Sequence, residues 1–323
     1  MLSHRIPQKI ARRLKLPLIA APMLSVSGPD LVIAACKAGV VGSFPVANAR
    51  SIEGVNSWLT QIETALAESA EQSERPPAPF CPNLIIKRAE MRAELDALVE
   101  HRVEMVITSV GSPEPVLEAL KNAGCLVLAD VASVRHAEKA VAAGVDGLVL
   151  LTAGAGGQTG WVNPFAFVRA VRKFWDGIVV MAGGMSDGQA IAAAETLGCD
   201  LAYMGTKFIA TRESLAKDEY KAMLVKSRLD DVLLTKAFTG LETNMLRPSI
   251  AAAGLDPNDL PQRGAIDIAK DINAAERDKP TSKRWKDIWS AGHSVSGVAD
   301  VPSVAELVER TAREYASVQV VKA

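Results

Sequence analysis

The chain has 323 residues, with 36 lysines and arginines against 37 aspartates and glutamates and a formal net charge of -1. Because this charge is balanced and aromatic residues make up only 5% of the chain, the composition gives no basis for recruiting nucleic acid or an anionic membrane. Hydrophobic residues make up 49%, which is ordinary for a globular protein and excludes disorder, coiled coil and collagen. The length allows one large domain or two small ones.

The cysteines are far apart and each lies in an apolar stretch: Cys36, Cys81, Cys125 and Cys199. There is no Cys-x-x-Cys motif and no paired histidine, so no metal site is predicted. We expect all four thiols to be buried and reduced, as is usual for cysteines of cytoplasmic proteins. The apolar run near the N-terminus is short and interrupted by Pro17 and Pro22, and no segment reaches the ~20 apolar residues of a membrane span. We therefore expect a soluble, cytoplasmic protein.

Short apolar runs alternate with longer helical patterns over the first two thirds of the chain. The expected strands are Leu18–Met23, Val40–Phe44, Phe80–Ile85, Met105–Thr108, Leu126–Ala129, Leu148–Leu151, Ile178–Ala182 and Leu201–Met204. The expected helices are Pro29–Ala38, Ile52–Ala67, Ala89–Glu100, Pro113–Ala123, Val134–Ala143, Pro164–Phe174 and Asp187–Leu197. Eight βα units favour an α/β fold of the (β/α)8 TIM barrel type. An open, doubly wound sheet is the weaker alternative, because no G-x-G-x-x-G follows the first strand.

The alternation breaks after residue 214. Residues 215–283 look helical, with Leu215–Asp231, Ile250–Gly254 and Asp267–Arg277 as expected helices and no evident strand. Residues 1–214 and 284–323 are therefore expected to form the barrel, which ends in an amphipathic helix. The insertion is either an appendage packed on the barrel or a lid over its mouth. We favour the lid, because active sites of this fold lie at that face.

Two glycine-containing turns follow the last two expected strands. The first is MAGGMSDG, with Ala182, Gly183 and Gly184, and the second is MGTKF, with Gly205 and Thr206. In this fold a phosphate site commonly follows strands seven and eight, where backbone N–H groups can bind the anion. Each turn alone could merely reverse the chain. Both together, at the expected positions, favour phosphate binding, with the Thr206 hydroxyl as a further donor.

Three other segments are candidates for contact with a ligand. The sixth strand is followed by LTAGAGGQTGW, whose glycines, Gly156 and Gly157 among them, let backbone approach a ligand closely. The alternative is a flexible linker, but a flexible linker is not expected between a barrel strand and the helix that follows it. The backbone of Ala21, Pro22 and Met23 can lie against a flat ring. Asn83 has an amide side chain in an otherwise apolar run. This amide forms a hydrogen bond either with a ligand or with a buried group of the protein.

These residues resemble the nitronate monooxygenase family, formerly called 2-nitropropane dioxygenase. The resemblance rests on APM at the first strand, PNL at the third, AGGxxG after the sixth, AGG after the seventh, MGTKF after the eighth and WSAG near the C-terminus. Flavin-dependent enoyl reductases and NADH:quinone reductases share the pattern. The match covers nearly the whole chain. It is specific for the superfamily and much less so for the reaction.

The resemblance implies a non-covalent FMN at the mouth of the barrel. The phosphate positions of the family map onto the two glycine turns, and the positions that contact the isoalloxazine map onto residues 21–23 and Asn83. The glycine loop of the family maps onto Gly156 and Gly157, and its late segment maps onto Trp289, Ser290, Ala291 and Gly292. The family oxidises alkyl nitronates with oxygen or passes hydride from NAD(P)H to an acceptor, so a nicotinamide is a candidate co-substrate.

Two positions depart from the family pattern. The glycine loop of the family usually ends in a histidine that serves as base or substrate ligand, and here the position is Gln158, which cannot take a proton near neutral pH. His293, in WSAGH, is the histidine placed to substitute for it. Asp130 stands where many relatives have a lysine near the flavin, and an anion there disfavours negative charge on a reduced flavin unless Lys207 compensates.

The sequence thus predicts an FMN-dependent oxidoreductase acting on a small molecule, with Gln158 and His293 as catalytic candidates. Nitronate oxidation is the leading reaction. The first alternative is NAD(P)H-dependent reduction of a quinone or an activated C=C bond. The second is a flavin-free barrel that binds a phosphorylated metabolite. A homo-oligomer is left open.

Overall fold

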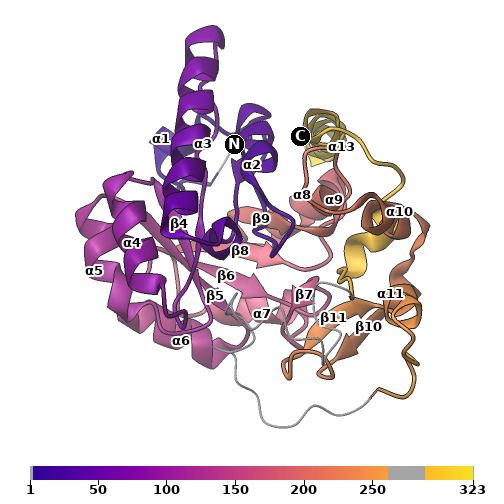
Figure 1. Ribbon diagram of the computed structural model, residues 1–323. Coiled ribbons are helices and arrows are strands. Elements are labelled where there is room, and N and C mark those ends of the chain that lie inside the picture. Colours follow the sequence, from indigo (N-terminus) through magenta and orange to yellow (C-terminus); the bar gives the residue numbers. More distant parts are fainter. Residues whose placement is uncertain (1–2, 261–287, 323) are drawn as a thin grey trace.

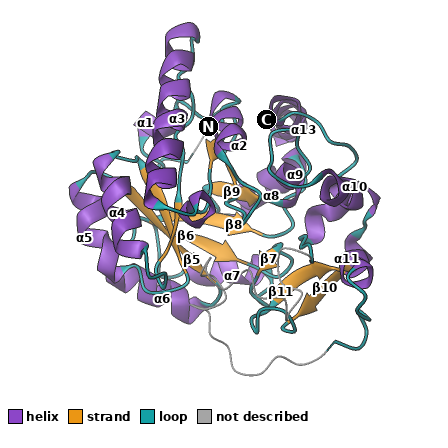
Figure 2. Cartoon of the chain, in the orientation of Figure 1, coloured by secondary structure: helices purple, strands orange, loops and turns teal. Residues whose placement is uncertain are grey.

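The computed structural model describes residues 3–260 and 288–322, and its centre is a parallel eight-stranded sheet (Figures 1 and 2). The strands are β1 (Leu18–Ala20), β2 (Val41–Gly42), β3 (Asn83–Ile85), β4 (Met105–Ser109), β5 (Leu126–Val131), β6 (Gly147–Leu151), β8 (Ile178–Ala182) and β9 (Leu201–Met204). Their order is β2-β1-β9-β8-β6-β5-β4-β3. Parallel bridges from Gly42 to Phe80 and from Pro45 to Asn83 join the first and last strands of this order. The sheet therefore closes, which confirms the predicted (β/α)8 barrel.

Helices surround the barrel between successive strands. They are α2 (Pro29–Lys37), α3 (Ile52–Gln72), α4 (Met91–Glu100), α5 (Glu114–Asn122), α6 (Val134–Ala143), α7 (Pro164–Val171), α8 (Gly188–Leu197) and α9 (Thr206–Ile209), with α1 (Gln8–Ala11) before and α13 (Val304–Lys322) after them. Short 3-10 segments are η1 (Val46–Ala49), η2 (Leu229–Asp231) and η4 (His293–Gly297). Gly144 and Gly198 end α6 and α8 with φ of +96° and +115°, the left-handed conformation that glycine adopts readily at the end of a helix. In the described part of the chain, no helix is both long and apolar enough to cross a bilayer.

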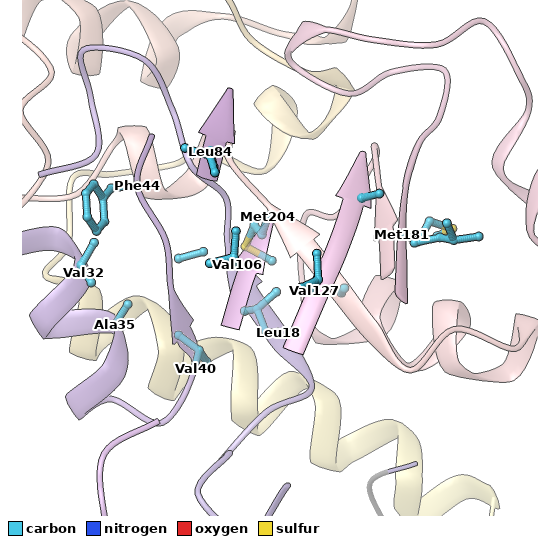
Figure 3. Packing of buried hydrophobic residues seen from close by; sticks show 14 of the residues in the cluster. Leu18, Val32, Ala35, Val40, Phe44, Leu84, Val106, Val127, Met181 and Met204 are labelled. Carbon is cyan, nitrogen blue, oxygen red and sulfur yellow. The ribbon is translucent and has the colours of Figure 1, made fainter. Parts of the chain in front are cut away.

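Two apolar layers hold the barrel together. The outer layer lies between strands and helices, and Figure 3 shows Val32 and Ala35 of α2 near Val40 and Phe44. The inner layer fills the barrel with side chains such as Leu128 and alternates with the outer layer along each strand. Ile6, Ile10 and Leu14 belong to the inner layer and cover the end of the barrel where the strands begin. The opposite end, where the strands finish, is the end open to a ligand.

The insertion differs from its prediction, because it contains two strands. β10 (Val232–Thr235) and β11 (Thr243–Leu246) pair antiparallel, and β11 also pairs with β7 (Gly157–Gln158) of the glycine loop. Figure 1 shows these strands together with α11 (Arg247–Ala252), with α10 (Asp218–Lys226) above them. The prediction of an insertion without strands was therefore wrong. The expected helix over Asp267–Arg277 lies outside the described residues.

A buried ion-pair network anchors the end of the barrel where the strands begin. The side chain of Asp200 is 1% exposed, and its Oδ2 accepts hydrogen bonds from Arg172 Nη2 at 2.5 Å and from Val179 N at 2.7 Å. Its Oδ1 accepts from Ser3 and lies 3.5 Å from Arg5 Nη1. The Asp200 carboxylate thus holds three parts of the chain together: the C-terminal end of α7, strand β8 and the N-terminal segment.

We expect Asp200→Ala to lower the free energy of unfolding by about 3–5 kcal/mol, because it leaves the buried Arg172 guanidinium without the carboxylate that neutralises its charge. Urea denaturation measures the loss. Asp176→Ala is the matched control: this carboxylate also pairs with Arg5, but its side chain is 85% exposed, so little change is expected. A loss below about 1 kcal/mol for Asp200→Ala would contradict a stabilising role for the network.

Candidate functional site

The two glycine turns lie at the mouth of the barrel, after neighbouring strands β8 and β9. Gly184 has a φ of +73° and is exposed, and a Cβ built on it meets nothing within 4 Å. A Cβ on Gly205 meets only Met23 Sδ at 3.5 Å and Ala21 Cβ at 3.6 Å. Among the described residues, no other group accepts a hydrogen bond from the amide N–H of Gly184, Gly205 or Thr206. The two turns therefore offer unpaired N–H donors, with open space beside Gly184, and such donors can bind an anion.

The hydroxyl of Thr206 joins the second turn to the late segment of the chain. Thr206 is 4% exposed, and its Oγ1 accepts a hydrogen bond from Gly292 N at 2.9 Å. Since the hydroxyl only accepts in this bond, its own hydrogen is free to donate to a ligand.

Most of the other glycines of the site allow two parts of the chain to approach each other closely, because a Cβ on them would clash with neighbouring protein atoms. A Cβ on Gly156 would lie 2.7 Å from the backbone N of Gly292, and one on Gly292 would lie 2.7 Å from Gly154 O. A Cβ on Gly183 would lie 2.5 Å from Thr152 Oγ1. The glycine loop and the late segment thus touch backbone to backbone. Gly157 is different, because its Cβ would meet only Ser290 Oγ, at 3.9 Å.

The insertion is hydrogen-bonded to both of these segments. Gln158 pairs with Thr243 and Gly157 with Asn244, whose buried side-chain amide donates to Ala155 O at 2.7 Å. On the same strand, Met245 bridges to Ser290. The described part of the insertion therefore forms one unit with the glycine loop and the late segment.

An aromatic pair fastens the late segment to α10. The rings of Trp289 and Tyr220 stack with centroids 5.0 Å apart and planes inclined by 10°, and the Tyr220 hydroxyl donates to Ser290 O at 2.5 Å. Burial raises the pKa of Tyr220 to about 12, so this hydroxyl stays protonated and keeps its donor role at neutral pH.

The loop after β1 is braced by a residue that sequence reasoning missed. Asn48 Nδ2 donates to Met23 O at 3.0 Å and to Ser27 O at 2.8 Å, and its Oδ1 accepts from Ser25 N at 2.9 Å. Ser27 Oγ accepts from Met23 N at 3.0 Å. Ser25 adopts a φ of +61°, so the loop is held in a shape that a free chain rarely takes. No local motif marks Asn48, because its partners lie 21 to 25 residues away.

Inside the mouth, polar side chains interrupt the apolar filling of the barrel. Asn83 is 6% exposed; its Nδ2 donates to Ile107 O at 3.3 Å, and its Oδ1 accepts from Ser109 Oγ at 3.2 Å. Both ends of this amide thus have partners within the barrel. Asp130, near the carboxyl end of β5, has no partner for its enclosed Oδ1.

The two catalytic candidates are both exposed and lie on different segments. Gln158 is on β7, and His293 begins η4, where its backbone N–H donates to Gly154 O at 2.9 Å. The His293 ring covers Gly154, since a Cβ there would lie 2.5 Å from Nδ1. The other histidines lie elsewhere: His4 and His136 are exposed, and His101 Nδ1 is 3.0 Å from Glu63 Oε2 of α3.

Comparisons with known proteins identify the relatives of the chain. The model of the nitronate monooxygenase family matches residues 7–314. A nitronate monooxygenase of Paraburkholderia phytofirmans is 29% identical, with 92% of each chain covered. A Rhodococcus jostii 5-hydroxy-7a-methyl-1-oxo-octahydro-1H-indene-4-carboxyl-CoA dehydrogenase is 25% identical, over 88% of this chain and 76% of the relative. The solved structure of a nitroalkane oxidase from Streptomyces ansochromogenes has a TM-score of 0.80 at 25% identity and covers 96% of this chain and 99% of that one.

Proposed function

Since the chain belongs to the nitronate monooxygenase family and is therefore an oxidoreductase, we propose that it holds FMN non-covalently at the barrel mouth and oxidises alkyl nitronates with O2. One observation carries the choice of cofactor: two neighbouring glycine turns offer unpaired amide N–H groups, and the space beside Gly184 is open. A single such site suits the one phosphate of FMN. No dinucleotide fingerprint follows the first strand, which disfavours FAD.

The residues at the mouth fit the parts of this cofactor. The amides of Gly184 and Gly205 and the Thr206 hydroxyl would hold the phosphate, because they are donors without another acceptor. The braced backbone of Ala21, Pro22 and Met23 would support the ring system from one side. In this proposal Asn83, Ala182 and Gly183 would line the FMN site at the mouth, and Gly156, Gly157, Trp289, Ser290 and Gly292 would close it from the glycine loop and the late segment. When bound, FMN supplies two-electron chemistry, taking electrons from a substrate and passing them to an acceptor.

Gln158 determines which substrates the site accepts. Its exposed amide can donate a hydrogen bond to an oxygen of a nitronate and orient it, but it cannot remove a proton from carbon near neutral pH. A nitronate has already lost that proton, whereas a neutral nitroalkane has not. The substrate of the leading reaction therefore arrives as the anion.

The same amide favours a second candidate function. An NAD(P)H-dependent reductase of a quinone or an activated C=C bond needs a group that binds a carbonyl oxygen, and it needs no base at position 158. Gln158 meets that requirement through its N–H donors. A flavin-free barrel that binds a phosphorylated metabolite is disfavoured, because family membership extends over residues 7–314 and not over the phosphate turns alone.

The insertion contributes to the choice of substrate in both readings. Its strands β10 and β11 extend the glycine loop as one sheet, so the side chain of Gln158 and the insertion share a surface. We propose that residues 215–283 act as the lid of the site, of which the part beyond residue 260 lies outside the described residues.

Anaerobic stopped-flow spectroscopy separates the two functions. The FMN-loaded protein is mixed with ethylnitronate, NADH or NADPH, and bleaching of the flavin absorbance is followed. Bleaching by ethylnitronate and reoxidation by O2 support the leading function. Bleaching by a nicotinamide alone, with reoxidation by a quinone or an enone, supports the second. A flavin that none of these compounds bleaches would contradict both.

A further inference from the structure

Asp130 is the one charged residue in the eight strands of the barrel. It shares the inward-facing alternation of β5 with Leu126 and Leu128, which belong to the inner apolar layer. It is the fifth of the six residues of β5. Its carboxyl group therefore sits inside the barrel close to the end where we place FMN.

Among the residues that the structure describes, no cation acts on this carboxyl group. Its Oδ1 is enclosed and has no hydrogen-bond partner among the described residues. The ionisable groups that face it are the thiol of Cys81, on the segment before β3, and the phenol of Tyr203, on β9. Burial raises the pKa of both groups well above their ordinary values, so both are neutral at physiological pH.

Lys207 does not neutralise the charge of Asp130, although the sequence suggested it as a counter-charge. The charged groups that act on Lys207 lie elsewhere: Glu314 and Arg310 on α13, Asp187 at the N-cap of α8, and Asp300 between η4 and α13. Without a counter-ion, burial raises the pKa of Asp130 to about 7. The carboxyl group is thus about half neutral at pH 7 before any ligand covers it.

We propose that Asp130 meets FMN as a neutral carboxylic acid, so that binding of the cofactor to the ionised site takes up one proton. This inference rests on the proposed function, because it requires FMN at the barrel mouth. A flat, largely apolar ring over the mouth removes the remaining water from Asp130 and raises the cost of its negative charge. The neutral acid has an O–H donor that can serve a polar edge of the ring.

The sign of the pH dependence follows from linkage. FMN favours the protonated site, so its affinity is highest below the pKa of the free site and declines as pH rises through about 7. Far above that value each pH unit costs about a factor of ten in affinity, as long as the bound site stays protonated. Between about pH 6 and about pH 9 the contribution of Asp130 thus reaches up to about a hundredfold.

The experiment is a titration of the apo protein with FMN, followed by quenching of FMN fluorescence, from about pH 6 to about pH 9. Asp130→Asn is the matched variant, since its amide keeps the size and neutrality of the protonated acid. The FMN phosphate also titrates near pH ~6, but equally for both proteins. The ratio of wild-type to variant affinity is therefore expected to fall up to about a hundredfold over this range. Calorimetry of wild type at about pH 8 in two buffers of different ionisation enthalpy should show uptake of nearly one proton beyond that of the variant.

Three outcomes are decisive. A wild-type affinity that changes with pH only as that of Asp130→Asn changes overturns the inference and leaves the proposed function standing. Proton release in place of uptake does the same. A wild type that binds no FMN at any pH overturns the proposed function and this inference with it. Infrared spectroscopy of the apo protein checks the premise separately, since a protonated carboxyl band at about pH 6 must be absent from Asp130→Asn.

Discussion

Gly184→Asp is expected to yield a colourless protein that no longer retains FMN. The substitution puts a carboxylate into the open space beside Gly184, where we propose that the amides of Gly184 and Gly205 bind the phosphate dianion of FMN. Like-charge repulsion of about 1–4 kcal/mol at close range lowers the affinity roughly ten- to a thousandfold. FMN affinity of the refolded apo variant, measured by fluorescence titration, checks the expectation.

Gly124→Asp is the matched control. Gly124 also has a positive φ, +78°, and a Cβ on it also meets nothing within 4 Å, so the side chain and the backbone strain are the same in kind. It precedes β5 and thus lies at the end of the barrel opposite Gly184. This variant should bind FMN as wild type does. Tight FMN binding by a folded Gly184→Asp variant would place the phosphate elsewhere.

Neutral nitroalkanes are expected to be oxidised at a negligible rate, because Gln158 cannot remove the proton on carbon. Activity should be confined to preformed nitronates or to hydride transfer from a nicotinamide. A histidine has an unperturbed pKa near ~6.5, and general-base catalysis contributes roughly 100- to 10,000-fold. Gln158→His should therefore raise the oxidation of nitroethane by a factor in that range. Steady-state oxygen consumption with nitroethane and with ethylnitronate, wild type beside variant, measures the effect.

Two further variants test whether the effect is specific to position 158. Gln61→Ala removes an exposed glutamine on α3, on the outside of the barrel, and should change no activity. Gln158→Ala should lower the activity toward ethylnitronate. If it leaves every detectable activity unchanged, position 158 does not face the substrate. If wild type oxidises nitroethane efficiently, another base exists, and the exposed His293 over Gly154 is the first residue to replace.

The barrel could be predicted from sequence because its signals are local. Each strand is a short apolar run, and glycines such as Gly144 and Gly198 end helices in the left-handed conformation that few other residues adopt. The glycine turns after β8 and β9 could be found for the same reason. In the structure the amides of Gly184 and Gly205 are unpaired and the space beside Gly184 is open, and the binding of FMN there stays a prediction.

The strands of the insertion could not be predicted, because their partners are distant. β11 pairs with β7, which is two residues long and ends at Gln158, so neither strand has an alternating pattern long enough to detect. The role of Asn48 is hidden in the same way, since it braces a loop more than twenty residues earlier. Asp130 could be noticed as a departure from the family pattern, but a sequence does not show which groups face its carboxylate; among the described residues no cation acts on it.

The proposal that the barrel mouth binds FMN is tested by identifying the cofactor that the purified protein carries. Purified protein is denatured, and the released small molecule is identified by absorbance, chromatography and mass. We predict a yellow protein that releases FMN, and not FAD, at close to one equivalent per chain. A colourless protein that cannot be reconstituted with FMN would contradict it.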